Sequence, residues 1–325
     1  MKRILSFTGC LFAFFIFFTL QNHAHAAEAN VNGIVMTQEQ YDRLKQFGFS
    51  DLAISQMDET VFNEFKDVVL ESQSQITQYY EDVEQPQQYQ IAQKSSLKKA
   101  INTNTNYTYK TTELTKEEYF KRVQALKNKQ GTNKINKKKI RPFSSDDTTR
   151  TSYRRLVTSI NRYNGNIELF QRFVWDIMPE TRSYDVLTIS IDNTFSPKAG
   201  SQHGQQLWRT YNPTYGDTSS GSASYYSSST TWTKDGAGYG VRMNLKNDAS
   251  NSKVFELEGY MHYKIMRNSS VRPYYINAYG NYSHAKKSID SSFSYGLDFG
   301  GPSISWSGES STSFAPITTH AQTKY

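Results

Sequence analysis

The sequence predicts a mainly β protein, in which an antiparallel β-sandwich (151–325) follows a small helical module (27–73) and a polar, basic linker (74–150). Apolar and polar residues alternate with a period of two in several C-terminal segments, as in strands with one buried face. The chain is rich in aromatic residues, with 23 Tyr and 19 Phe, and these residues favour strands. The turn dipeptides Asn164-Gly165 and Asp235-Gly236 separate candidate strands and are typical of hairpins.

The first 26 residues predict a secretory signal peptide. Lys2 and Arg3 precede the apolar run Ile4–Leu20, and Ala24-His25-Ala26 then forms a small-x-small cleavage motif before Ala27. The alternatives are a retained membrane anchor and a lipid-modified Cys10. The cleavage motif argues against the anchor, and the position of the apolar run after Cys10 argues against lipidation. We therefore expect cleavage between Ala26 and Ala27, and a secreted protein that is extracellular or associated with the cell surface.

The chain contains one cysteine, Cys10, and it lies within the predicted signal peptide. A mature chain that begins at Ala27 would contain no disulfide, no cysteine-ligated zinc, no iron–sulfur cluster and no cysteine nucleophile. Secreted proteins of the eukaryotic pathway often carry disulfides. The cysteine count therefore favours a Gram-positive bacterial origin.

Three short helices are predicted between residues 36 and 73. Thr37 and Gln40 form a capping box at the start of the first helix, and Gly48 is placed to end it. Ser50 caps a second helix and Asp58 caps a third. The apolar side of the third helix is predicted to consist of Val61, Phe62, Phe65, Val68 and Val69. This segment is interpreted as an interaction module or a spacer.

The segment 74–150 is rich in Gln, Asn, Lys and Thr, and it predicts a linker with one helix, which Thr115 and Glu118 would cap. Residues 114–141 carry ten basic and two acidic side chains. This stretch is either a solvated linker or a site for anionic polymer. For a secreted protein, cell-wall polymer is the better candidate, and we expect no nucleic acid partner. The candidate contacts are Lys134, Lys137, Lys138, Lys139 and Arg141.

The predicted sandwich rests on three alternating segments, each with one apolar and one polar face. The first apolar face contains Leu187, Ile189 and Ile191. The second contains Tyr239, Val241, Met243 and Leu245. The third contains Phe255, Leu257, Met261, Tyr263 and Ile265, opposite Glu256, Glu258, Tyr260, His262 and Lys264. About eight such strands, each with one solvated face, predict antiparallel pairing.

No motif in the sequence indicates a metal or an organic cofactor, and we expect neither. The histidines after the signal peptide are His203, His262, His284 and His320, and they form no His-x-His or His-Glu-x-x-His motif. Glu258 shares a strand face with His262 but lies about 14 Å away along the strand, too far to share one ion.

Enzyme motifs are also missing, so the sequence favours a protein without catalytic activity. Glu256 and Glu258 would lie about 7 Å apart on one strand, within the range of paired glycosidase carboxylates. Alternating acids on a solvated strand give the same pattern. The chain contains no Gly-x-Ser-x-Gly motif and no phosphate-binding glycine loop. A secreted hydrolase with a site assembled from separate strands is the first alternative.

Aromatic residues supply the best binding candidates, because sugars pack against aromatic faces and a tyrosine also offers a hydroxyl. The candidates are Trp208, Tyr225, Tyr226, Trp232, Tyr274 and Tyr275. The second alternative is a β-pore-forming toxin, since the tract Thr218–Thr233 is rich in Ser and Thr. Neither face of that tract is as apolar as a membrane hairpin requires. We therefore expect no stable membrane insertion, and cell-wall polymer or carbohydrate as the partner.

Several segments resemble secreted proteins of Bacillus-type Gram-positive bacteria that have no assigned activity. In the helical module, Gly48-Phe49-Ser50 is followed by Ile54 and Met57. The C-terminal segments are Met178-Pro179, Thr181–Val186, Asn277–Ala285 and Pro302–Gly308. The resemblance implies secretion and a helical motif followed by a β-rich domain, and it implies no catalytic residue. We therefore expect a secreted surface protein that binds cell wall or glycan and has no catalytic activity.

Overall fold

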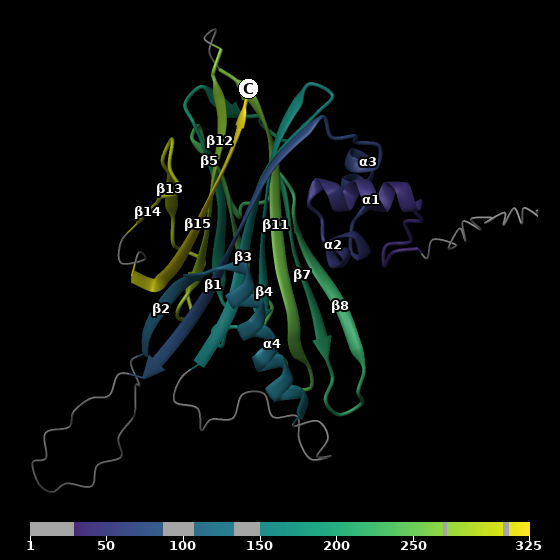
Figure 1. The fold of residues 1–325 in the computed structure, drawn as a ribbon, viewed down its shortest axis with the longest axis vertical. Coiled ribbons are helices and arrows are strands. Elements are labelled where there is room, and N and C mark those ends of the chain that lie inside the picture. Colours follow the sequence, from purple (N-terminus) through teal and green to yellow (C-terminus); the bar gives the residue numbers. More distant parts are fainter. Residues whose placement is uncertain (1–28, 87–106, 133–149, 269–271, 308–311) are drawn as a thin grey trace, which may run out of the picture.

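The computed structural model describes residues 29–86, 107–132, 150–268, 272–307 and 312–325. The predicted fold class is confirmed: the protein is mainly β, with antiparallel sheets and a few helices (Figure 1). The predicted signal peptide, with Ala26 and Ala27, lies outside the described residues. So do Lys134, Lys137, Lys138, Lys139 and Arg141. Within the described part of the chain, no helix combines the length and apolar character needed to cross a bilayer.

The larger sheet has eight strands in the order β2-β1-β3-β4-β11-β7-β8, and β6 pairs with β11 beside this path. Its strands are β1 (Ser72–Pro86), β2 (Tyr107–Leu114), β3 (Arg150–Tyr163), β4 (Asn166–Ile177), β6 (Phe195–Pro197), β7 (His203–Tyr211), β8 (Thr218–Tyr225) and β11 (Lys253–Arg267). The predicted turn Asn164-Gly165 joins β3 to β4, and both of its residues have positive φ, as a type I′ turn requires.

The smaller sheet has five strands in the order β15-β12-β5-β10-β9. Its strands are β5 (Tyr184–Ile191), β9 (Trp232–Asp235), β10 (Gly238–Asn244), β12 (Tyr275–Ala285) and β15 (Phe314–Lys324). The predicted turn Asp235-Gly236 joins β9 to β10. A separate two-stranded ribbon consists of β13 (Tyr295–Leu297) and β14 (Ile304–Trp306).

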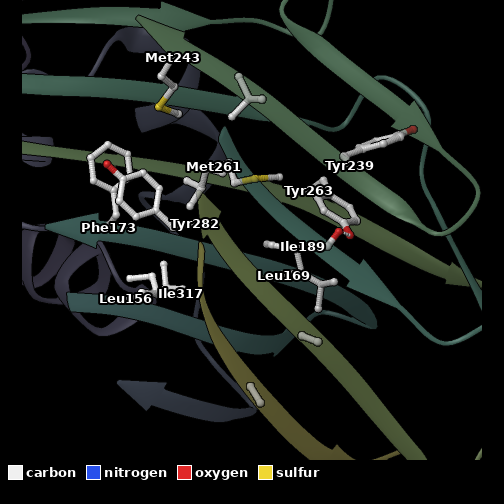
Figure 2. Packing of buried hydrophobic residues seen from close by; sticks show 14 of the residues in the cluster. Leu156, Leu169, Phe173, Ile189, Tyr239, Met243, Met261, Tyr263, Tyr282 and Ile317 are labelled. Carbon is white, nitrogen blue, oxygen red and sulfur yellow. Dashed lines mark hydrogen bonds between the residues drawn. The ribbon is translucent and has the colours of Figure 1, made fainter. Parts of the chain in front are cut away.

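The main hydrophobic core lies between the two sheets. The predicted apolar faces of β5 and β10 are buried there, against residues of β3, β4 and β11. Figure 2 shows Phe173 of β4 beside Tyr282 of β12, and these rings stack with centroids 4.2 Å apart. Met243 and Met261 fill the neighbouring space (Figure 2). Inward-facing residues of both sheets therefore form one sandwich core.

The helical module contains α1 (Gln38–Phe47), α2 (Asp51–Ser55) and α3 (Glu59–Phe65). The predicted caps are confirmed: Thr37 and Gln40 form the capping box, and Ser50 and Asp58 accept from backbone amides of their helices. Gly48 ends α1 with a φ of 131°. Val69, predicted on the apolar side of α3, is instead exposed, because α3 ends at Phe65 and Val69 lies beyond it.

The helical module packs on the outer face of the larger sheet (Figure 1). The ring of Phe49 lies 5.2 Å from both Phe170 and Tyr260, measured between centroids. This contact corrects the expectation of one solvated face on β11. Glu258 and His262 are buried together with Tyr260, because the helices cover the face that the sequence predicted to be polar. Phe255 is exposed, since the register shifts between Val254 and Glu256.

The predicted linker also needs correction. Residues 72–86 form β1, which pairs with β3 from Ser72↔Arg162 to Glu84↔Arg150, and residues 107–114 form β2. The polar composition concealed β1, because its inward side chains include Asp82, which pairs with the buried Arg154 at 2.7 Å. The predicted helix is present as α4 (Lys116–Thr132), and Thr115 interacts with Glu118 at its start.

Candidate functional site

A pocket of about 330 Å³ lies where α3 approaches the larger sheet. Four segments distant in sequence form its wall: α3, the loop 198–203, the segment after β8, and β11. The polar and aromatic side chains that line it include Thr60, Glu64, Gln202, His203, Tyr226 and Lys264. Small-molecule sites commonly occur in such hollows between structural units. This pocket is therefore the candidate functional site.

Asp58 positions α3 against the pocket. Its Oδ1 atom accepts from the amide of Val61 at 2.9 Å, so the residue caps the helix. Its Oδ2 atom accepts from the hydroxyl of Tyr226 at 3.0 Å. Asp58 therefore both caps α3 and fixes the ring of Tyr226 in the pocket.

The loop 198–203 is fixed to β11 by backbone contacts. The amide of Lys198 donates to the carbonyl of Lys264 at 2.8 Å, and the amide of Lys264 donates to Oγ of Ser201 at 3.0 Å. Gly200 makes the turn with a φ of 79°, which a residue with a side chain adopts only with strain. These contacts hold the loop, and with it Gln202 and His203, as one rigid wall.

His203 and Gln202 bring unpaired polar atoms to the wall. His203 is only 7% exposed, and neither of its ring nitrogens has a hydrogen-bond partner among the described residues. Gln202 is buried as well; its amide donates to the carbonyl of Ser227 at 3.3 Å, while its Oε1 atom has no partner in the described structure. Buried polar groups are nearly always hydrogen-bonded. These three atoms are excluded from solvent, so a ligand hydroxyl in the pocket would become their partner only after the two side chains rotate.

Beneath the pocket, His203 contacts a buried polar cluster that contains His262, Glu168 and Tyr163. Its ring centroid lies 5.6 Å from that of His262, which faces it across β7 and β11. Nδ1 of His262 lies 2.6 Å from Oε1 of Glu168, and the other oxygen of Glu168 accepts from the hydroxyl of Tyr163. Nε2 of His262 has no partner among the residues that the structure describes.

The electrostatics of the pocket favour a neutral histidine. Burial, together with the proximity of His262, lowers the pKa of His203 to about 3, although Asp58 acts in the opposite direction. Burial disfavours the charged form of Lys264, but its 2.6 Å contact with Glu64 and the charge of Glu168 together outweigh this effect and raise the pKa of Lys264. Burial and the bond to Asp58 raise the pKa of Tyr226.

This arrangement offers hydrogen-bonding groups and a histidine that burial holds in its neutral form. A general base works best with a pKa near the working pH, and that of His203 is far lower. Lys264 at the rim is paired with Glu64, whereas Lys198, which also lines the pocket, forms no salt bridge among the described residues. Among the described residues, no group of three or more His, Cys, Asp and Glu side chains is placed to hold a metal ion.

The structure brings one of the six predicted aromatic residues, Tyr226, into this pocket. Trp232 is buried in the core, and its Nε1 donates to the carbonyl of Tyr226 at 3.0 Å. Tyr225 is buried too, and its hydroxyl accepts from Gln206. Trp208 packs against the core, with Nζ of Lys246 5.2 Å from its ring.

Tyr274 and Tyr275 are exposed and lie elsewhere, at the start of β12, where their rings meet edge to face with centroids 4.6 Å apart. The six predicted aromatic residues therefore do not form one binding surface.

The carboxylates weighed for hydrolysis have separate partners. Glu258 is buried, accepts from Ser50 and lies 3.3 Å from Arg172. Glu256 lies 3.1 Å from Arg209 at the surface. Each carboxylate is thus neutralised by its own arginine, and neither lines the pocket.

Sequence reasoning missed Gln202, Glu64 and Lys264 as pocket residues, and considered His203 only as a metal ligand. The four wall segments are separated by long stretches of chain, so no local pattern indicates that they meet. One signal was available: the capping residue Asp58 identifies the start of α3, whose next turn carries Glu64.

No protein-family model matches the sequence, and no curated protein matches it significantly. Two solved structures show weak similarity. One is described as a pore forming protein, with 7% identity and a TM-score of 0.24, over 53% of this chain and 86% of that chain. The other is Clostridium perfringens delta-toxin, with 8% identity and a TM-score of 0.20, over 53% of this chain and 83% of that chain. At these TM-scores neither similarity supports an argument about function.

Proposed function

We propose that this protein is a secreted surface protein of a Gram-positive bacterium, without catalytic activity, that binds a glycan through the pocket beside α3. The observation that carries the proposal is the pairing of two buried, unpartnered polar side chains, His203 and Gln202, with the ring of Tyr226 in one hollow. The predicted signal peptide supports the location, and the absence of catalytic motifs from the sequence supports the lack of activity.

A sugar residue matches the chemistry of this wall. The ring of Tyr226 is 46% exposed and offers an apolar face on which the C–H side of a sugar ring would pack. His203 in its neutral form offers one donor and one acceptor, and Gln202 offers an acceptor at Oε1. Sugar hydroxyls both donate and accept, so they would satisfy both groups once the two side chains rotate toward the pocket.

The pocket lining contains one lysine that is paired and one that is not. Glu64 and Lys264 pair with each other at the rim, whereas Lys198 forms no salt bridge among the described residues. A cationic ligand would lose hydration without gaining an unpaired counter-charge. The expected partner is therefore a surface or wall glycan that is neutral or carries an acidic group beside Lys198.

The test is isothermal titration with soluble neutral wall glycan fragments and with common monosaccharides. Tyr226→Ala is expected to weaken binding about tenfold or more, because it removes the stacking face. Tyr226→Phe retains the ring and should bind nearly as the parent protein does. Tyr215→Ala, at an exposed tyrosine outside the pocket, is the matched control.

Other outcomes would decide for the alternatives. Release of reducing sugar during the titration would favour the hydrolase, and dye release from liposomes would favour the pore-forming protein. Equal binding by the parent protein and Tyr226→Ala would overturn the assignment of the pocket.

A further inference from the structure

A second surface, which we call the arginine–tyrosine end, lies where β12 begins and β15 ends. Three arginines surround one ring there: the guanidinium carbons of Arg162, Arg267 and Arg272 lie 5.8, 5.9 and 5.8 Å from the ring centroid of Tyr325. These arginines come from the end of β3, the end of β11 and the segment before β12. Figure 1 shows this end of the sandwich beside the C-terminus.

The ring at the centre is held in place. The amide of Tyr325 donates to the carbonyl of Tyr274 at 3.1 Å, and its ring packs on Phe195 with centroids 5.8 Å apart. Arg162 donates to the carbonyl of Lys324 at 3.3 Å. The cluster is therefore assembled by the fold and does not depend on chance proximity of free side chains.

The three guanidinium groups carry positive charge close together around one ring. No carboxylate of the described residues lies within 4.0 Å of Arg162, Arg267 or Arg272. Like charges held together repel each other, and contact with the ring of Tyr325 offsets only part of this cost. A guanidinium packed on an aromatic face keeps its N–H edge free, and that edge matches the oxygens of a phosphate.

Exposed apolar and aromatic side chains adjoin the arginines. Tyr274 is 69% exposed, Tyr275 is 39% exposed, and Met266, next to Arg267, is 48% exposed. Tyrosine rings are enriched at membrane–water interfaces, where one end of the side chain is apolar and the other is hydrated. A soluble phosphate polymer would leave the rings of Tyr274 and Tyr275 in water, whereas the headgroup region of a lipid surface would cover them.

We propose that the arginine–tyrosine end binds the surface of a membrane that contains anionic phospholipids. The three arginines contact lipid phosphates, while Tyr274 and Tyr275 enter the headgroup region. The association is peripheral and reversible, since it uses side chains at one end of a folded sandwich. It is independent of the glycan pocket.

The test is co-sedimentation with vesicles of phosphatidylcholine, with and without about one third phosphatidylglycerol. The triple variant R162Q/R267Q/R272Q should lose about fivefold in partitioning for each cation, or about a hundredfold in total. The matched control K110Q/K246Q/K287Q removes the same charge from exposed lysines on β2, after β10 and after β12, outside the basic stretch 114–141 and away from this end, and should partition as the parent does.

Two further variants distinguish the contribution of the positive charges from that of the tyrosine rings. R162K/R267K/R272K keeps the charge and should retain most of the binding. Y274S/Y275S should bind weakly even where anionic lipid is abundant. Thermal melting of each variant shows whether the fold is intact.

The proposal would be overturned if the arginine variant and the lysine control partitioned equally onto anionic vesicles. It would also be overturned if the parent protein bound neutral vesicles as well as it binds anionic vesicles. A third contrary outcome is arginine-dependent binding to inorganic polyphosphate without any binding to vesicles.

Discussion

Nδ1 of His262 lies 2.6 Å from Oε1 of Glu168, and both side chains are completely buried where the helical module covers the larger sheet. The two residues lie diagonally across β11 and β4, where His262 is opposite Phe170 and Glu168 is opposite Lys264. The ring of Phe65 in α3 lies above His262, with centroids 5.0 Å apart. The contact between Phe65 and His262 therefore connects β11 of the larger sheet to α3, the helix that forms one wall of the pocket.

Replacement of Glu168 should destabilise the protein strongly. Glu168→Leu would leave both His262 and the hydroxyl of Tyr163 without a partner in a dry site. Breaking a buried pair in this way costs about 3–5 kcal/mol. Urea denaturation measures the loss, and Glu39→Gln is the control, because its pair with Arg43 is exposed and contributes at most about 1 kcal/mol. Equal losses in the two variants would contradict the assignment.

Phe49 is expected to hold the helical module on the sheet. It is almost fully buried between Phe170 and Tyr260, so Phe49→Ala should reduce the free energy of unfolding by about 3–5 kcal/mol. Val69→Ala is the control at an exposed apolar position, with an expected change within about 0.5 kcal/mol. Hydrogen exchange should show faster exchange in α1–α3 for Phe49→Ala. Unchanged protection of these helices would show that the contact is not the main one.

Replacement of the buried pair Arg154 and Asp82 would test whether β1 lies within the sandwich. Arg154 also donates to the carbonyl of Ala315 at 3.0 Å, so the arginine joins the two sheets. Asp82→Leu alone should cost about 3–5 kcal/mol, because it leaves the arginine buried without a counter-charge. The double variant Asp82→Leu with Arg154→Met should recover much of the loss in a denaturation series. A double variant as unstable as the single one would mean that packing, and not charge, dominates.

Local sequence signals predicted local structure well in this chain. The caps Thr37, Ser50 and Asp58 lie where the sequence placed them, since a cap depends on only a few neighbouring residues. The alternation of Tyr239, Val241 and Met243 likewise identified a strand with a buried face.

Contacts between distant segments were harder to predict. The sequence did not predict β1, because its inward face carries the charged residues Asp82 and Glu84. Asp82 can be buried there because it pairs with Arg154, a residue distant in the sequence. In the pocket, Tyr226 was predicted as a binding residue for its chemistry alone. Its neighbours His203 and Glu64 reach it only through the packing of α3 on the sheet, which no short motif encodes.

The pH dependence of stability follows from His203. Its pKa falls from 6.5 to about 3 on folding, chiefly because of burial. Between these values the unfolded chain binds a proton at this site that the folded chain does not, so acidification favours unfolding. The contribution of the neutral histidine is fully present above about pH 6.5 and is lost as the pH falls toward 3. The slope from this one group is at most about 1.4 kcal/mol per pH unit.

The measurement is urea denaturation at pH 7, 6, 5 and 4 for the parent protein and for His203→Gln. Carboxylates also titrate over this range, but they are shared by both proteins, so the difference between the two curves isolates His203. The variant should lose less stability than the parent between pH 6.5 and pH 4, because glutamine cannot take up the proton. Parallel curves for the two proteins would contradict a neutral, buried His203, and would also remove the basis for its role as a hydrogen-bonding group toward a sugar.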